Sequence, residues 1–303
     1  MNKKMIFLGL KAALSVLILL FLLNRIRLEE VAGALASAAL TPLIAAVLLL
    51  ALNLYLQFAK WRLLVLSETA GASAKEIFFS LLAGITLGLA TPGRMGEYGR
   101  PFFLKRAHWA RLLGLTVIDK LYTFSVILFT GSLGLCCAAA KPLWAVIIPI
   151  TALFLLVLVL RPDALGGLLK KYRASPRLAE FVSALSGFSR ANARKLSFLA
   201  LLYVLTFMTQ FYLLVRAFFP INPVQGMCAS SATLLTKTLL PLAIGDLGIR
   251  EGAAVFFFGR FQVPAAAAFD ASLLLFIINV LAPGLAGLIT LLRSRASAIR
   301  ALG

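Results

Sequence analysis

The sequence predicts an all-α polytopic membrane protein. Hydrophobic residues make up 61% of the 303-residue chain and charged residues only 14%, and the mean hydropathy is +0.98. These values do not describe a soluble globule. Apolar runs long enough to cross a bilayer core of about 30 Å alternate with short basic connections. We therefore expect one transmembrane domain over residues 1–303, with about six full spans and two re-entrant broken-helix hairpins, eight helical hydrophobic segments in total.

Two full spans are expected near the N-terminus. Lys3 and Lys4 precede an apolar run over 5–23, which is too long for the core of a typical signal peptide and lacks a nearby cleavage pattern. We interpret it as an uncleaved first span. The run over 42–66 is expected to be the second span, and the short stretch 25–39 between them an interfacial helix.

The next apolar segment, 77–91, looks too short to cross. Its roughly 15 residues cover about 22 Å as a helix, less than the hydrocarbon core. Four bases follow it and would lie on the outer side if it did cross: Arg100, Lys105, Arg106 and Arg111. A hairpin that enters the membrane and returns to its starting side removes this conflict.

The remaining apolar runs supply four more spans and a second hairpin. The spans are expected at 112–140, 143–160, 196–219 and 265–292. Between the last two of these, the run over 228–258 is interrupted by charges, glycines and a proline, so we expect it to be a hairpin entering from the opposite side.

The most polar region, 161–195, holds eight basic and two acidic residues. Apolar residues recur in it at helical spacing: Leu178, Phe181, Val182, Leu185 and Phe188. We expect a cytoplasmic basic loop, part of which forms an amphipathic helix lying on an anionic leaflet. A solvated loop with little core contact is the alternative.

The distribution of bases predicts the orientation. Of the 30 lysines and arginines, this topology places twenty on the side of the N-terminus and five on the other, so both termini should be cytoplasmic in a bacterial inner membrane. The order span, span, hairpin, span in 1–140 recurs with opposite orientation in 141–303. This order predicts an inverted-topology repeat, the arrangement by which transporters expose one site alternately to either side.

Both hairpins carry charges beside helix-breaking residues. The first contains TPGRMGEYGRPFFLKR over 91–106, and the second LLPLAIGDLGIREG over 239–252. A charge in hydrocarbon costs roughly 2.5–3.5 kcal/mol on insertion scales, so such residues normally face a cavity or a partner. The candidate site residues are Arg94, Glu97, Arg100, Asp119, Lys237, Asp246, Arg250 and Glu251.

These residues are suited to binding a phosphate. Broken helices expose backbone N–H groups, and arginines add rigid donors. We expect Arg94 and Arg100 to meet Lys237 and Arg250 near the midplane as an anion-binding cluster, while the acids bind an amine, carry a coupling proton or hold the bases in place. A polar stripe before Lys237 (Ser230, Ser231, Thr233 and Thr236) favours a lined cavity or hydrogen bonds between helices.

The alternative is that the charges pair only with one another so that broken helices are tolerated. Glu97 would then pair with Arg94 or Arg100, and Asp246 with Arg250.

Other kinds of site have little support. His108 is the only histidine, and the three cysteines form neither a disulfide framework nor a metal-binding spacing. We therefore expect no metal and no cofactor, and assign no catalytic residue. The formal net charge of +19 is dispersed between apolar runs, which argues against nucleic acid as a partner.

Three motifs resemble those of the lysylphosphatidylglycerol synthase transmembrane, or flippase-like, family. They are PGRMGEYGR at 92–100, DKLY at 119–122 and GDLGIREG at 245–252. In that family this domain moves aminoacylated phosphatidylglycerol between leaflets and is fused to a cytosolic aminoacyl transferase. The resemblance implies a stand-alone flippase-like module with functional residues at the matching motif positions, and related modules are linked to polyprenyl-phosphate and hopanoid-type lipids.

The leading functional hypothesis is therefore a translocase for a phosphate-containing lipid, gripped by arginines while its chains stay in the bilayer. The alternatives are a membrane-embedded transferase with Glu97 or Asp119 as general base, and an accessory subunit of a lipid-modifying complex. Expected partners are a lipid with an anionic phosphate headgroup and anionic leaflet lipids, with a separate synthase or a homo-oligomer as further candidates.

Overall fold

The computed structural model describes residues 38–69, 71–89, 91, 93–104, 109–139, 142–160, 176–240 and 247–300. All regular elements in these ranges are helices, without strands. They are α3 (Leu40–Glu68), α4 (Ala74–Leu89), the 3₁₀ helix η1 (Met95–Phe103), α5 (Trp109–Ala139), α6 (Pro142–Leu160), α8 (Pro176–Ser186), α9 (Arg190–Phe218), α10 (Pro223–Leu239), α11 (Ile249–Gly259), α12 (Ala265–Phe276), the π-helical turn η3 (Ile277–Leu281) and α13 (Ala282–Arg300). The expected first span and interfacial helix lie outside the described residues.

Four helices in the described part of the chain are long and apolar enough to cross a membrane: Leu40–Glu68, Trp109–Ala138, Arg190–Phe218 and Ala265–Arg293. A shorter apolar helical stretch covers Ile147–Leu158. These elements confirm the all-helical membrane class, whereas the expected total of six spans and the inverted repeat stay predictions.

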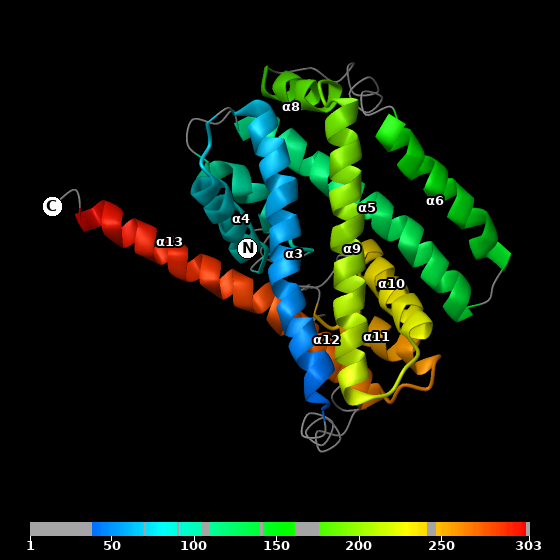
Figure 1. Cartoon of the computed structure of the whole chain (residues 1–303). Coiled ribbons are helices and arrows are strands. Elements are labelled where there is room, and N and C mark those ends of the chain that lie inside the picture. Colours follow the sequence, from blue (N-terminus) through cyan, green and yellow to red (C-terminus); the bar gives the residue numbers. More distant parts are fainter. Residues whose placement is uncertain are drawn as a thin grey trace, which may run out of the picture.

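α3 and α9 run antiparallel along much of their length (Figure 1). At one end, the Ala39 N–H donates to the carbonyl of Ala217 over 2.7 Å. Further along, the Gln210 side chain donates to the carbonyl of Ala46 over 2.8 Å and accepts from Asn279 over 2.7 Å. Because all three side-chain and backbone groups are buried among apolar helices, these bonds tie α3, α9 and η3 together.

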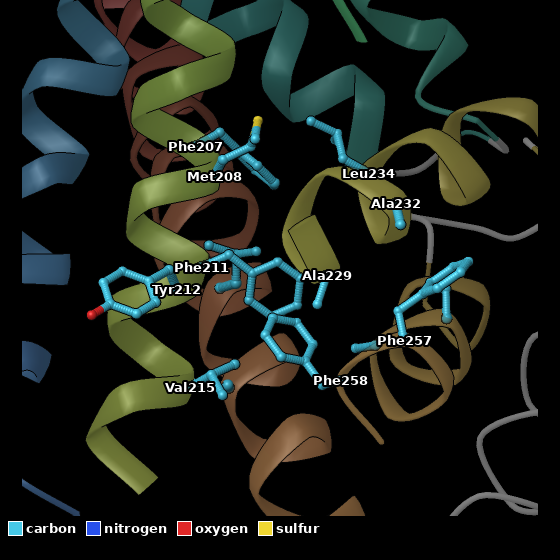
Figure 2. Close-up of a cluster of buried hydrophobic side chains, with 14 of the residues drawn as sticks. Phe207, Met208, Phe211, Tyr212, Val215, Ala229, Ala232, Leu234, Phe257 and Phe258 are labelled. Atoms are coloured by element: carbon cyan, nitrogen blue, oxygen red, sulfur yellow. The ribbon is translucent and has the colours of Figure 1, made fainter. Parts of the chain in front are cut away.

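The core of the second half of the chain lies between α9, α10, α11 and α12. Figure 2 shows Phe211 of α9 facing Phe258 of α11, with Ala229 of α10 beside them; the two ring centroids are 5.2 Å apart. Small residues let the helices approach closely. A Cβ on Gly226 of α10 would lie 2.3 Å from the Tyr212 ring, so glycine is required there.

A second core joins α3, α4, α5 and the start of α9, around Trp61, Leu64 and Leu115. α8 lies across this end of the bundle (Figure 1) and buries Val182 and Ala184 against it. The amphipathic helix expected within 161–195 is therefore present, and its contact with a leaflet stays a prediction.

α5 packs along α10, which brings the two halves of the chain together. Gly131 and Gly134 of α5 lie at this contact, where a Cβ on Gly134 would be 2.0 Å from the hydroxyl of Ser231. The helices that surround the site described next, α3, α5, η1, α9 and α10, thus come from both halves.

Candidate functional site

A cavity of about 440 Å³ lies between α3, η1, α5, α9 and α10. Among the described residues that line it, five are basic and two are acidic: Lys60, Arg94, Arg100, Lys120 and Lys237, with Glu97 and Asp119. Apolar side chains, including Phe124, Ile127 and Leu234, form much of the remaining wall. The cavity lining therefore combines charged and apolar side chains.

The first hairpin places two of the charged side chains by packing η1 directly on α4. Glycines make this approach possible: a Cβ on Gly84 would lie 2.8 Å from the Arg100 Cβ, and one on Gly88 would lie 2.9 Å from the Glu97 Cγ. The turn between the two helices uses left-handed backbone at Gly93 (φ 56°) and Arg94 (φ 57°). This backbone conformation is uncommon for arginine, so the surrounding turn must hold Arg94 in a conformation that its own backbone disfavours.

Asp119 of α5 lies between two cations from different elements. Its carboxylate is 2.9 Å from the Lys60 Nζ and 2.7 Å from the Arg100 guanidinium. Lys60 also donates to the Thr123 hydroxyl over 2.8 Å, and Arg100 stacks on the Trp61 ring at 4.2 Å. Both cations and the acid are almost fully buried, so α3, η1 and α5 are joined by a buried ionic cluster.

Glu97 of η1 is shared in the same way. It forms ion pairs with Arg94, at 2.5 Å, and with Lys120 of α5. Each acid in the cavity thus serves two bases, so the pairs leave a formal excess of positive charge. Among the described lining residues the bases outnumber the acids, so this lining is electrostatically suited to an anion.

Lys237 adds a base from the second half of the chain to the cavity lining. It is near the end of α10, with its Nζ 5.7 Å from the centroid of the Phe207 ring. Five of the eight candidate residues named from the sequence, Arg94, Glu97, Arg100, Asp119 and Lys237, therefore line one cavity.

Arg250 and Glu251 lie elsewhere, at the start of α11, and are not among the residues that line the cavity. They pair with each other, and both contact the Ser272 hydroxyl of α12, at 3.0 and 3.1 Å. Glu251 also accepts the Gly248 N–H over 2.6 Å. The expected cluster of Arg94, Arg100, Lys237 and Arg250 thus has its first three members in the cavity and its fourth in a separate buried ion pair.

Asp246 lies outside the described residues. For the sequence alternative in which charges only pair with one another, Glu97 does bind Arg94, whereas Arg100 binds Asp119 instead of Glu97.

Two lining cations were not among the sequence candidates, Lys60 and Lys120. Lys60 falls inside the expected span over 42–66 but was not singled out there as a site residue, and α3, which continues to Glu68, buries it. Its spacing gave a signal, since Asn53, Gln57 and Lys60 share one helical face in an otherwise apolar run. Lys120 directly follows Asp119 in the sequence. Its ion pair with Glu97 forms only because the fold packs α5 against η1, so no signal for it was present in the sequence.

Asp270 of α12 was also missed. It is 2% exposed, and within the described part of the chain neither carboxylate oxygen has a hydrogen-bond partner. It is not among the residues that line the cavity.

Long apolar helices around a buried charged cavity define a multi-pass helical membrane protein with an internal polar site. Comparison with family models is specific: the model described as the lysylphosphatidylglycerol synthase TM region matches residues 8–287. The chain therefore belongs to this family, as its motifs predicted. A search of curated proteins finds no match to the chain.

Proposed function

We propose that the protein binds the phosphate of a lipid headgroup in this cavity and moves the lipid between the two leaflets. The observation that carries the proposal is the composition of the cavity lining, in which five bases stand against two acids among the described lining residues. Arginine guanidinium groups form short, charge-assisted bonds with phosphate oxygens, so a phosphate monoanion or dianion would offset this excess.

The apolar wall supports a lipid rather than a free anion. Phe124 and Ile127 of α5 and Leu234 of α10 line the cavity together with the charged residues. Acyl or prenyl chains next to them would leave the cations to the headgroup. Aminoacyl-phosphatidylglycerol, a polyprenyl-phosphate-linked lipid or a hopanoid-type lipid meets this description, and the family membership supports the first of these.

The proposal places the protein in the bacterial inner membrane with both termini in the cytoplasm, since the basic residues lie mainly on that side of the predicted topology. The α4–η1 pair and the α10–α11 pair would then be the two re-entrant hairpins of an inverted repeat.

The ion pairs favour transport over the transferase alternative. A general base needs a carboxylate that is accessible to the proton it removes. Glu97 and Asp119 each hold two cations, which suits a role in positioning bases or receiving the ammonium group of an aminoacyl headgroup.

The shared acids make a clean test possible. Arg100→Gln removes one cation from the cavity, yet Asp119 keeps Lys60 as its partner at 2.9 Å, so the variant should fold. Arg260→Gln is the matched control because Arg260 is exposed and stacks on Phe256 outside the cavity.

The measurement is the rate at which headgroup-labelled phosphatidylglycerol crosses the bilayer in proteoliposomes containing the purified full chain. We expect Arg100→Gln to slow this rate at least about tenfold, the scale of one lost hydrogen bond to a charged group, and Arg260→Gln to leave it unchanged. Equal rates for Arg100→Gln and the unmodified protein would reject the cavity as the transport site.

A further inference from the structure

A second hollow, which we term the α3–α9 groove, lies at one end of the bundle. It has a volume of about 530 Å³ and is lined by the last turns of α3 and the first turns of α9: Ala59, Arg62, Leu63, Leu66, Ser67, Asn192, Lys195, Phe198 and Leu199. None of these residues lines the charged cavity.

The groove combines polar and apolar residues from the ends of two helices. Because α3 and α9 are antiparallel, Ser67 near the end of α3 and Asn192 near the start of α9 lie at the same outer end. From there, the helices carry the groove inward by about 10 Å to Ala59 and Leu199, at a rise of about 1.5 Å per residue. On α9, Asn192 and Lys195 therefore lie nearer the outer end than Phe198 and Leu199, whereas on α3 Arg62 lies among Ala59, Leu63 and Leu66.

The charges of the groove are of one sign. Arg62 and Lys195 are exposed and basic, and the lining contains no acidic residue. Within the described part of the chain, neither side chain forms an ion pair. The acid at the end of α3, Glu68, is already bound by Arg111 at 2.8 Å.

The groove also lies at the end of two helices that are long and apolar enough to cross a membrane. α8, which is amphipathic, lies across the same end of the bundle (Figure 1). Phe198 is 61% exposed and Leu66 41% exposed, so the apolar part of the groove opens outward toward the space that lipid chains occupy in a bilayer.

From these features we propose that the α3–α9 groove is a binding site for an anionic phospholipid of the surrounding bilayer. Arg62 and Lys195 bind the headgroup phosphate, and one acyl chain lies along Leu63, Phe198 and Leu199. Basic side chains snorkel from apolar helices to the headgroup region and attract anionic lipids there. This site is separate from the charged cavity, and it does not depend on the proposed translocation.

The test is native mass spectrometry of the purified full chain with phosphatidylglycerol or phosphatidylcholine added. All proteins carry Arg100→Gln, so that binding in the charged cavity is weakened equally throughout. The groove variant is Arg62→Gln/Lys195→Gln. The matched control is Arg190→Gln/Arg194→Gln, which removes two exposed charges from the same end of α9 outside the groove.

We expect the groove variant to bind phosphatidylglycerol on the order of tenfold more weakly, because two bases next to an anionic headgroup are lost. The control should bind as before, and phosphatidylcholine should bind weakly to every protein. Equal losses in the groove variant and the control would show general attraction to positive charge and overturn the proposal. So would unchanged binding in the groove variant, or equal binding of phosphatidylcholine.

A second variant tests the apolar lining without changing charge. Phe198→Ala should weaken binding of phosphatidylglycerol, whereas Phe256→Ala, another exposed aromatic residue outside the groove, should not. Retained affinity in Phe198→Ala would contradict the placement of the acyl chain.

Discussion

Two buried arginines, Arg100 and Arg250, differ in how their acids are shared. Arg100 is 4% exposed and binds Asp119, which also binds Lys60. Arg250 is 2% exposed and binds Glu251, which has no second basic partner in the described residues. Losing one member of a buried ion pair is expensive mainly because the other charge is left uncompensated. The two sites should therefore respond differently to the same substitution.

Arg250→Met is expected to lower the free energy of unfolding by about 3–5 kcal/mol, because Glu251 loses its cation while remaining buried. Arg100→Met should cost clearly less, since Lys60 still neutralises Asp119. The measurement is equilibrium unfolding of both purified variants in mixed micelles. Equal losses would show that the ionic partners do not determine the stability of either site.

For individual residues, the sequence predicted which charged side chains line the cavity better than it predicted their ion-pair partners. Charges inside apolar runs identified Arg94, Glu97, Arg100 and Asp119, because such charges are costly anywhere but in a cavity. Lys60 was missed because a lysine near a span end can either snorkel to the surface or turn inward. Only the packing of α3 against α5 decides between these outcomes.

The hairpin of α4 and η1 depends on glycines whose roles differ. A Cβ on Gly96 would lie 2.1 Å from the carbonyl oxygen of Leu87, which is backbone in the middle of a helix turn. A Cβ on Gly99 would lie 2.9 Å from the Leu87 Cδ1, the end of a side chain that can rotate away. The first contact requires the two helices to separate, and the second does not.

Gly96→Ala is therefore expected to displace η1 from α4, lower the thermal stability and abolish the lipid binding that depends on Glu97 and Arg100. Gly99→Ala should leave both close to their original values. Thermal unfolding and mass spectrometry of co-purifying lipid, compared between the two variants, check this. A Gly96→Ala protein with unchanged stability would mean that the close approach is not required.

Helix positions followed closely from the sequence because apolar runs and breaker residues mark them directly. The expected segment 77–91 corresponds to α4, and the returning part of that hairpin contains η1. The expected stripe from Leu178 to Phe188 corresponds to α8 and the residues that follow it. The π-helical turn η3, which contains Asn279 bonded to Gln210 of α9, was not expected, because no sequence pattern marks such a turn.

Across the whole molecule, the contact between α5 and α10 joins the two halves of the chain. The first span of the predicted element order lies outside the described residues, and both this order and the symmetry between the halves stay predictions. If the two halves move against each other during transport, a covalent link between α5 and α10 should block that movement.

The chain offers a native means of applying this restraint, because Cys228 of α10 packs on Gly134 of α5, about one helical turn before Cys137. Mild oxidation with copper phenanthroline should join Cys228 to Cys137, with two thiol hydrogens and two electrons passing to the oxidant. We expect lipid transport in proteoliposomes to fall on oxidation and to recover with reductant.

Intact mass should report the loss of two hydrogens, and Cys137→Ser protein should transport normally under oxidising conditions. Full transport by the cross-linked protein would exclude a required movement between α5 and α10.

The ionic cluster also has a consequence for biosynthesis. The cations shown to bind Glu97 and Asp119 all come from residues 60–120. These charges can therefore be neutralised as soon as α5 has entered the bilayer, while the second half is still on the ribosome. Lys237 arrives later with α10, so the emerging chain first builds a stable ionic framework and only afterwards closes a cavity around it.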